Sequence, residues 1–273
     1  MSELGRRVPT AVVYGAVLFV GVLGGPSAFA ALLAVISALA YAELVVLYRD
    51  RAVGPAGAGL ILVATLAAPR LFVGRDITVD LVVLGLGGVG AGVALWGRGA
   101  SARLGSTIAA SVYVGWLFGY LADLGRAGSF HTFHGLPPTF PSWLLLALLP
   151  TWAADITSYA VGSAFGRHKL APRLSPGKTW EGTLAGIGAA ALAALGVGAF
   201  AGIPRPAVAL VAFALGAVAL GGDLFESSLK RRVGAKDSGT LLPGHGGALD
   251  RIDSLIFVAP LVTIALFLAG TLG

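Results

Sequence analysis

Long apolar runs recur along the chain, and they constrain its fold more than any other feature. A helix that crosses a bilayer needs about 20 consecutive apolar residues. The runs are continuous rather than alternating, which favours helices over the strands of a barrel. The sequence therefore predicts an all-α, polytopic integral membrane protein with about nine transmembrane helices. The expected spans are 8–24, 28–48, 54–70, 77–96, 106–124, 142–164, 183–202, 206–226 and 252–271.

Composition excludes a soluble domain. Hydrophobic residues make up 56% of the 273 residues and charged residues only 12%, whereas ordinary globular chains carry about 25% charged residues. The chain has no cysteine, which excludes disulfides, thiol catalysis and cysteine-ligated metals. The net charge of +6 lies in short loops between apolar runs. It therefore indicates membrane topology and an anionic substrate, and we expect no nucleic-acid partner.

Basic residues indicate the orientation of the spans. With nine spans and a cytoplasmic N-terminus, only Arg70, Arg75, Arg126 and Arg205 of the 19 Lys and Arg residues fall in outside loops. Because basic residues concentrate in cytoplasmic loops, this split favours a cytoplasmic N-terminus and an outside C-terminus. The segment Ala28-Phe29-Ala30 resembles a signal-cleavage site, but another apolar run follows at once, so we expect the first span to be retained.

Few ionisable residues lie in the apolar runs of the first half. Glu43 is near the inner end of the second run, and Asp80 is near the outer end of the fourth. We expect each to be interfacial or paired with another helix. We therefore take residues 1–140 as an N-terminal scaffold of transmembrane helices.

Acidic residues are concentrated in the second half. Seven of the 13 acids lie there: Asp155, Glu181, Asp223, Glu226, Asp237, Asp250 and Asp253. Ionisable groups at membrane depth cost at least about 2.5 kcal/mol each, so they usually pair, bind ions or line a cavity. We therefore expect residues 141–273 to form a C-terminal catalytic region with two cytoplasmic polar loops, 165–182 and 223–254.

The first polar loop contains Gly177-Lys178-Thr179, which is similar to the end of a phosphate-binding P-loop. That motif needs a glycine where this chain has Pro172, and it needs a preceding strand, so we reject it. The hydroxyls of Ser175 and Thr179 and the charge of Lys178 remain candidates for phosphate contacts. Thr179 would also start a helix whose N–H groups face an anion. A basic topology anchor explains the loop equally well.

The second polar loop places acids at two expected helix ends. If the eighth span continues helically past Asp223, one face carries Asp223, Glu226, Ser227 and Lys230. If the ninth span begins near Asp250, then Asp250 and Asp253 also share a face. Carboxylates with few nitrogen or sulfur ligands nearby suit hard cations such as Mg²⁺.

Basic residues accompany these acids, namely Lys230, Arg231, Lys236 and Arg251. Acids and bases around a metal–polyphosphate complex are typical of phosphoryl transfer. The glycines at 244, 246 and 247 would let the backbone approach a ligand closely. A salt-bridged cytoplasmic loop is the alternative explanation. Composition and residue spacing thus predict an enzyme that carries out metal-dependent phosphate chemistry at a membrane.

The second loop resembles the signature of the phosphatidate cytidylyltransferase family. The matching positions are Ser227, Leu229, Lys230, Arg231, Lys236, Asp237, Gly239, Leu242, Pro243, His245, Gly246, Gly247, Asp250, Arg251 and Asp253. The first loop is also similar to the family pattern, at Asp155, Tyr159, Gly162, Phe165-Gly166, His168-Lys169-Leu170, Ser175-Pro176, Lys178-Thr179 and Glu181-Gly182. Two departures are Ala248, where the family usually has a larger aliphatic residue, and Gly177, where it often has lysine.

The resemblance implies that CTP and phosphatidate react to give CDP-diacylglycerol and pyrophosphate. It implies a requirement for Mg²⁺, with a second cation left open, and a homodimer in the lipid bilayer. The enzyme would be a multi-pass protein of the cell membrane with its active site on the cytoplasmic side.

The same resemblance assigns roles to residues. Asp223 and Asp250 would hold the metal, with Asp155 as a further candidate, and Lys230 and Arg231 would join Asp223 and Asp250 as catalytic residues. The implied substrate-binding residues are Ser175, Lys178, Thr179, Ser227, Lys236, Asp237, His245, Gly246, Gly247, Arg251 and Asp253.

Two other functions stay open at this point. One is another CTP-dependent lipid enzyme, such as a polyprenol or phytol kinase or an archaeal CDP-lipid synthase. The other is an ion-coupled transporter, whose acids would carry ions near the membrane midplane. The expected clustering of the acids at one cytoplasmic boundary argues against transport.

Overall fold

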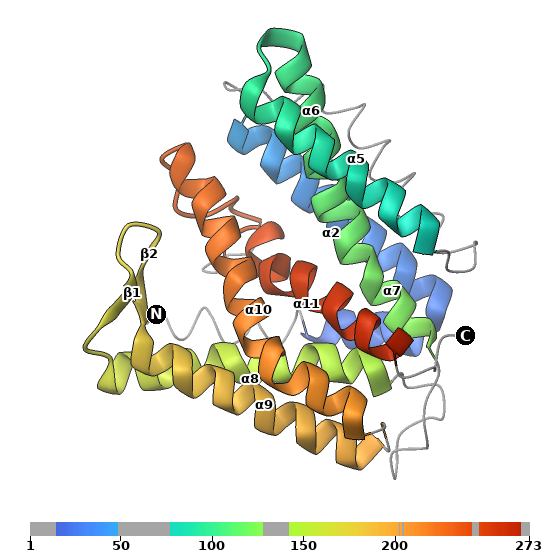
Figure 1. Cartoon of the computed structure of the whole chain (residues 1–273), viewed down its shortest axis with the longest axis vertical. Helices are drawn as coiled ribbons and strands as arrows, with labels where there is room; N and C mark the ends of the chain where they lie inside the picture. The colour runs from blue at the N-terminus through green and yellow to red at the C-terminus, as the bar shows by residue number, and fades with distance from the viewer. Residues whose placement is uncertain are drawn as a thin grey trace. The chain divides into compact units, whose positions relative to one another are not determined.

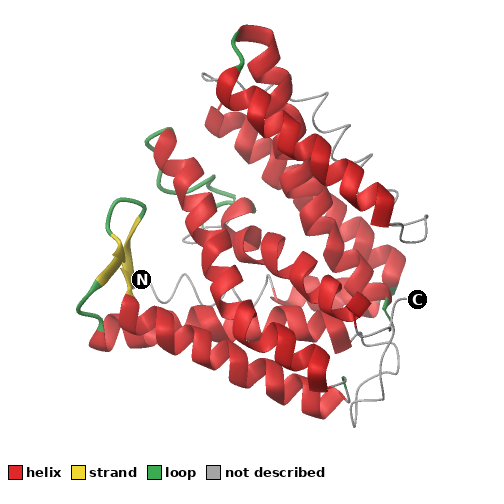
Figure 2. Cartoon of the chain, in the orientation of Figure 1, coloured by secondary structure: helices red, strands yellow, loops and turns green. Residues whose placement is uncertain are grey.

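The structure, a computed structural model, describes residues 15–48, 77–127, 142–201, 203, 205–241 and 246–268. These residues are almost entirely helical (Figure 2). Within them, six helices are long and apolar enough to cross a membrane. Their bounds are Pro26–Tyr48, Thr78–Trp96, Gly99–Arg126, Ser142–Phe165, Trp180–Ala201 and Val211–Arg232. The protein is therefore an all-α, polytopic membrane protein, as the apolar runs predict.

The count of nine spans stays a prediction. The expected span 54–70 lies outside the described residues, as does the beginning of 8–24. The expected ninth span is helical, as α11 (Leu249–Leu268), although it is not among the six. Its first turn carries Asp250 and Arg251, followed by Asp253, so the apolar part begins only beyond these charges.

The described chain divides into two compact units. The first comprises Met1–Ala122 and Val233–Ile252, and the second comprises Asp123–Arg232 and Asp253–Gly273. This geometric division differs from the functional boundary at residue 140, because residues 233–252 of the second polar loop belong to the first unit. The assignment of scaffold and catalytic roles to 1–140 and 141–273 remains a prediction.

The first unit is built on packed helices (Figure 1). They are α2 (Pro26–Tyr48), α5 (Ile77–Trp96), α6 (Gly99–Ser111) and the π-helical turn η1 (Val112–Leu117). Helices α5 and α6 approach closely, because a Cβ on Gly105 would overlap the carbonyl oxygen of Gly90. Leu81, Leu86 and Val89 on α5 are exposed, as expected for side chains that face lipid.

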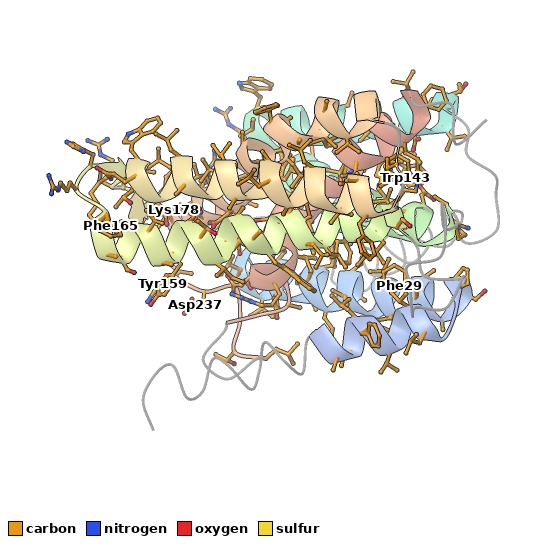
Figure 3. All side chains as sticks on the ribbon, turned by 90° about the horizontal axis from the view of Figure 1, so that it is seen from below. Phe29, Trp143, Tyr159, Phe165, Lys178 and Asp237 are labelled. Atoms are coloured by element: carbon orange, nitrogen blue, oxygen red, sulfur yellow. The ribbon has the colours of Figure 1, made fainter. Side chains whose placement is uncertain are left out.

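Three long helices form most of the second unit: α8 (Ser142–Phe165), α9 (Trp180–Ala201) and α10 (Arg205–Arg232). Helices α8 and α9 lie side by side, with Trp143 near one end of the pair and Phe165 near the other (Figure 3). Their close approach depends on small residues, since a Cβ on Gly186 would overlap the Ser158 hydroxyl. The short helix α7 (Phe118–Arg126) contains residues of both units, as does α11.

The first polar loop, 165–182, contains a β-hairpin (Figure 2). Strand β1 (Lys169–Ala171) pairs antiparallel with β2 (Ser175–Thr179), with Lys169 opposite Thr179 and Ala171 opposite Ser175. The Leu174 N–H donates to the Ala171 carbonyl and closes the turn. The strand pairing supplies hydrogen bonds to backbone groups that are no longer part of a helix. Both strands are edge strands, so Pro176 can be accommodated in β2. The all-α class therefore holds except for this hairpin.

The second polar loop is shorter than the expected 223–254. Helix α10 continues through Arg232, and α11 begins at Leu249. Residues 233–248 connect the two helices. Asp223, Glu226, Ser227 and Lys230 therefore lie on one helix with the spacing that places them on a common face.

Candidate active site

An ion pair joins the hairpin to helix α10. Lys178 Nζ on β2 lies 2.6 Å from Asp223 Oδ2, and both side chains are about one-quarter exposed. The Ser227 hydroxyl, one turn further along α10, donates to Asp223 Oδ1 over 3.3 Å. Each oxygen of the Asp223 carboxylate therefore has a polar contact, which fixes its direction.

A small pocket lies beside Lys178 in the second unit. Asp155 and Ser158 of α8, Thr183 of α9, and the α10 backbone at Gly216 line it together with Lys178. Figure 3 shows Lys178 at the hairpin end of the α8–α9 pair, at the same end as Phe165. The pocket is small and mostly apolar, but it places a carboxylate, two hydroxyls and a cation together.

The two basic residues predicted to be catalytic on α10 have structural contacts. Lys230 Nζ lies 2.6 Å from Glu226 Oε2, and both side chains are buried. Arg231 Nε donates to the carbonyl oxygen of Leu174 over 3.1 Å and so ties the hairpin turn to α10. The Arg231 contact joins the two polar segments of the sequence, whereas the Lys230 pair lies within α10. A direct contact of either cation with phosphate stays a prediction.

Thr179 begins helix α9, as its position in the sequence predicts. Its hydroxyl accepts a hydrogen bond from the Gly182 N–H over 3.2 Å, which is the usual N-cap arrangement. Glu181 accepts from the backbone N–H groups of Arg167 and His168, and its carboxylate also lies 2.7 Å from His168 Nδ1. The half-buried Ser175 begins β2. The hairpin is thereby anchored at the start of α9.

Asp250, in the first unit, is held from two directions. Its Oδ2 accepts the backbone N–H of Ser238 over 2.8 Å, the Ser238 hydroxyl over 2.9 Å and the Gly247 N–H over 2.7 Å. Gly246 has φ +78°, and a Cβ there would overlap Asp250 Oδ2. A glycine at 246 is therefore needed for the backbone to wrap the carboxylate.

Glu43 was expected to be interfacial or paired with another helix, but it was not among the predicted site residues. Its carboxylate accepts the backbone N–H groups of Ala248 and Leu249 and the hydroxyl of Ser238. Glu43 precedes these partners by about 200 residues and belongs to no motif, so spacing could not find it. The available signal was an acid inside an apolar run, which is costly unless it is compensated.

The remaining predicted residues are dispersed. Lys236 and Asp237 are exposed, and Figure 3 labels Asp237. Arg251 Nε is buried without a hydrogen-bond partner among the described residues, which suits an anionic ligand. Asp253 Oδ1 accepts the Ser254 N–H. His245 lies outside the described residues.

The carboxylates at Asp223 and Asp250 suit a magnesium ion whose remaining ligands come from the substrate and from water. Among the described residues, no three His, Asp or Glu side chains converge as a ready-made metal site. Magnesium is usually bound through one or two carboxylates together with substrate phosphates and waters, so a larger cluster is not required. At Asp223, the Lys178 ammonium already occupies a cation position against the carboxylate. A metal ion bound at this carboxylate would therefore compete with the Lys178 ammonium.

Sequence comparison places this site in a family. The chain matches the cytidylyltransferase family across residues 5–269. It belongs to that family. The family membership covers both units and both polar segments, so the hairpin and the Asp250 segment are parts of one family architecture.

Among similar proteins, a phosphatidate cytidylyltransferase of Brucella abortus biovar 1 (strain 9-941) is 50% identical over 112 residues, which are 41% of this chain and 42% of the relative. The phosphatidate cytidylyltransferase of Pseudomonas aeruginosa is 48% identical over 145 residues, covering 46% of this chain and 48% of the relative. That of Bacillus subtilis is 38% identical over 161 residues, covering 58% and 56%. The chain thus spans about half the length of these relatives.

Proposed function

We propose that the protein is a phosphatidate cytidylyltransferase, which converts CTP and phosphatidate to CDP-diacylglycerol and pyrophosphate. The observation that carries this proposal is the pairing of Lys178 with Asp223 beside a small pocket in a member of the cytidylyltransferase family. The names of relatives that are 38–50% identical over the aligned parts support the same substrates.

The proposed reaction is an in-line displacement at phosphorus. An oxygen of the lipid phosphate attacks the α-phosphorus of CTP, and a new P–O bond forms. The bond between the α-phosphorus and its bridging oxygen breaks, and pyrophosphate leaves with the electron pair. The second pKa of a phosphate monoester is about 6, so the nucleophile is already an anion at neutral pH. A strong general base is therefore unnecessary.

The chain's own residues orient the reactants and compensate charge. Lys178 and Arg251 contact phosphate oxygens as the negative charge shifts to pyrophosphate. The hydroxyls of Ser175 and Thr179 and the Gly246-Gly247 backbone complete the contacts to the nucleotide. Asp223 and Asp250 would hold Mg²⁺, which when bound neutralises the polyphosphate and favours loss of the leaving group. Asp155, Asp237 and Asp253 orient these groups.

The reaction takes place in the cell membrane on the cytoplasmic side, where CTP is available. The distribution of basic residues favours this orientation. We further propose that the protein works as a homodimer, as its resemblance to the family implies.

A phosphate-labelling experiment tests the proposal against its closest rival. Purified protein in detergent is incubated with Mg²⁺, phosphatidate and CTP that carries label in either the α- or the γ-phosphate. A cytidylyltransferase transfers the α-label to lipid and releases the γ-label in pyrophosphate. A lipid kinase, given polyprenol or phytol in a parallel incubation, transfers the γ-label to lipid and leaves the α-label in CDP.

Failure of both labels to enter lipid, with solute uptake into proteoliposomes, would instead indicate a transporter. A matched control uses material purified in the same way from cells that carry an empty expression vector. Labelled lipid in that control would identify a contaminating enzyme.

A further inference from the structure

We propose that Glu43 is a positioning residue for the metal-binding Asp250, so that helix α2 takes part in the reaction although it lies far away in the sequence. The inference rests on the proposed cytidylyl transfer. It assigns a function to a residue of the N-terminal half, which the sequence suggests is scaffold only.

The Glu43 carboxylate caps helix α11. Its Oε1 accepts the Ala248 N–H over 2.7 Å, and its Oε2 accepts the Leu249 N–H over 2.9 Å. The first N–H groups of a helix have no intrahelical partner, and the helix dipole favours a negative charge beside them. A carboxylate from another helix supplies both. Glu43 therefore fixes the position at which α11 begins, and Asp250 lies in that first turn.

Ser238 couples the two carboxylates. Its hydroxyl lies 2.9 Å from Glu43 Oε2 and also 2.9 Å from Asp250 Oδ2. A hydroxyl has a single proton, so the two acceptors share it. Because Ser238 is only 5% exposed, water does not readily replace it. Movement of either carboxylate therefore alters the hydrogen bond of the other.

The surrounding backbone leaves space for the Glu43 side chain. A Cβ on Gly247 would overlap Glu43 Oε2, and one on Gly239 would lie 3.0 Å from Oε1. Both glycines belong to the segment that carries the family-like motif. The Glu43 carboxylate thus contacts the backbone on two sides, and a larger residue at 239 or 247 would occupy its space.

The test compares Glu43→Gln, Glu43→Asp and Ser238→Ala with the wild type. Glutamine keeps one oxygen but turns an N–H₂ donor toward groups that are themselves donors. Aspartate keeps the charge on a shorter side chain. The matched control is Asp123→Asn, which removes another carboxylate of a spanning helix whose partner is Arg126 on the same helix.

Three measurements separate positioning from general stability. The first is the Mg²⁺ concentration for half-maximal turnover at saturating CTP and phosphatidate. The second is the rate of trypsin cleavage after the exposed Lys236, read by mass spectrometry of the fragment that starts at Asp237. The third is the thermal midpoint in detergent.

We expect Glu43→Gln to raise the Mg²⁺ requirement by about 10-fold or more, the usual effect of losing a residue that supports a metal ligand. Cleavage after Lys236 accelerates, Glu43→Asp restores part of both effects, and Asp123→Asn changes neither. A Glu43→Gln protein with wild-type Mg²⁺ requirement and cleavage rate would overturn the inference. A loss of thermal stability with unchanged Mg²⁺ requirement would do so as well.

The two proposals fail in different ways. An inactive wild type refutes the cytidylyl transfer, while the cleavage rates still decide whether Glu43 holds the segment that leads to Asp250. If the wild type is active and Glu43→Gln has the wild-type Mg²⁺ requirement and cleavage rate, only the inference about Glu43 is refuted.

Discussion

Lys178 Nζ and Asp223 Oδ2 lie 2.6 Å apart and connect strand β2 to helix α10. The pair brings together one residue from each polar segment of the sequence. It also places an ammonium against the carboxylate to which we assign a metal. Lys178 and the cation therefore compete for Asp223, and this competition yields the first prediction.

The Lys178→Ala variant should bind Mg²⁺ more tightly while turning over more slowly. A partly exposed ion pair is worth up to about 1 kcal/mol, so its removal should improve Mg²⁺ affinity by at most about 5-fold. Turnover should fall by about 100-fold, because the ammonium no longer stabilises developing charge. Calorimetric titration of Mg²⁺ and a turnover assay measure the two effects. Weaker Mg²⁺ binding in this variant would show that Lys178 and the cation do not compete.

Replacing either proposed metal ligand should abolish turnover without unfolding the protein. We expect Asp223→Asn and Asp250→Asn each to lose about 100-fold or more, since even residues that only support ligands cost about 10–100-fold. Turnover and gel filtration in detergent check this. Retained activity in one variant removes that residue from the metal site.

Gly246→Ala should impair the Asp250 side of the site. The backbone at Gly246 has φ +78°, and the added methyl group would overlap Asp250 Oδ2. We expect turnover to fall by about 10-fold or more. Gly177→Ala is the matched control, because a Cβ there has no neighbour within 4 Å. Equal activity of the two variants would contradict this account.

Thr179→Ala should destabilise the start of helix α9. Loss of an N-cap hydroxyl costs about 1 kcal/mol, and Thr179 is 3% exposed, so water does not substitute for it. Thermal unfolding in detergent measures the change. Thr179→Ser keeps the hydroxyl and should restore the midpoint. A serine variant as unstable as the alanine variant would assign the effect to packing instead.

Arg231→Lys should loosen the hairpin while keeping the charge. Lysine cannot reproduce the directed Nε–H bond to the Leu174 carbonyl. Trypsin cleavage after Arg173, next to that carbonyl, should therefore accelerate. Arg232→Lys, the adjacent substitution, provides the comparison. Unchanged cleavage in Arg231→Lys would show that the hydrogen bond does not restrain the hairpin.

Local patterns predicted the parts of this fold that depend on short-range physics. Apolar run length located α2, α8 and α9, and helical spacing placed Ser227 beside Asp223. Thr179 was predictable as a helix start because capping depends on neighbouring residues. These features require no knowledge of tertiary contacts.

The hairpin and the role of Glu43 were not predictable in this way. The segment 165–182 has prolines and charges that are typical of a loop, and its pairing is completed by a contact from Arg231. Glu43 and Ser238 are 195 residues apart. A hydrogen bond between residues so far apart produces no helical or strand periodicity that a single sequence could reveal.

The capping of α11 by Glu43 has a consequence for synthesis of the chain. At about 5–20 residues per second, the 195 residues between Glu43 and Ser238 take roughly 10–40 s to make. During that interval the carboxylate lacks the partners it has in the finished protein. The first unit is therefore completed only when the C-terminal segment emerges. A nascent chain that stops before residue 238 leaves an exposed acid, which membrane quality control could recognise as a sign of incomplete assembly.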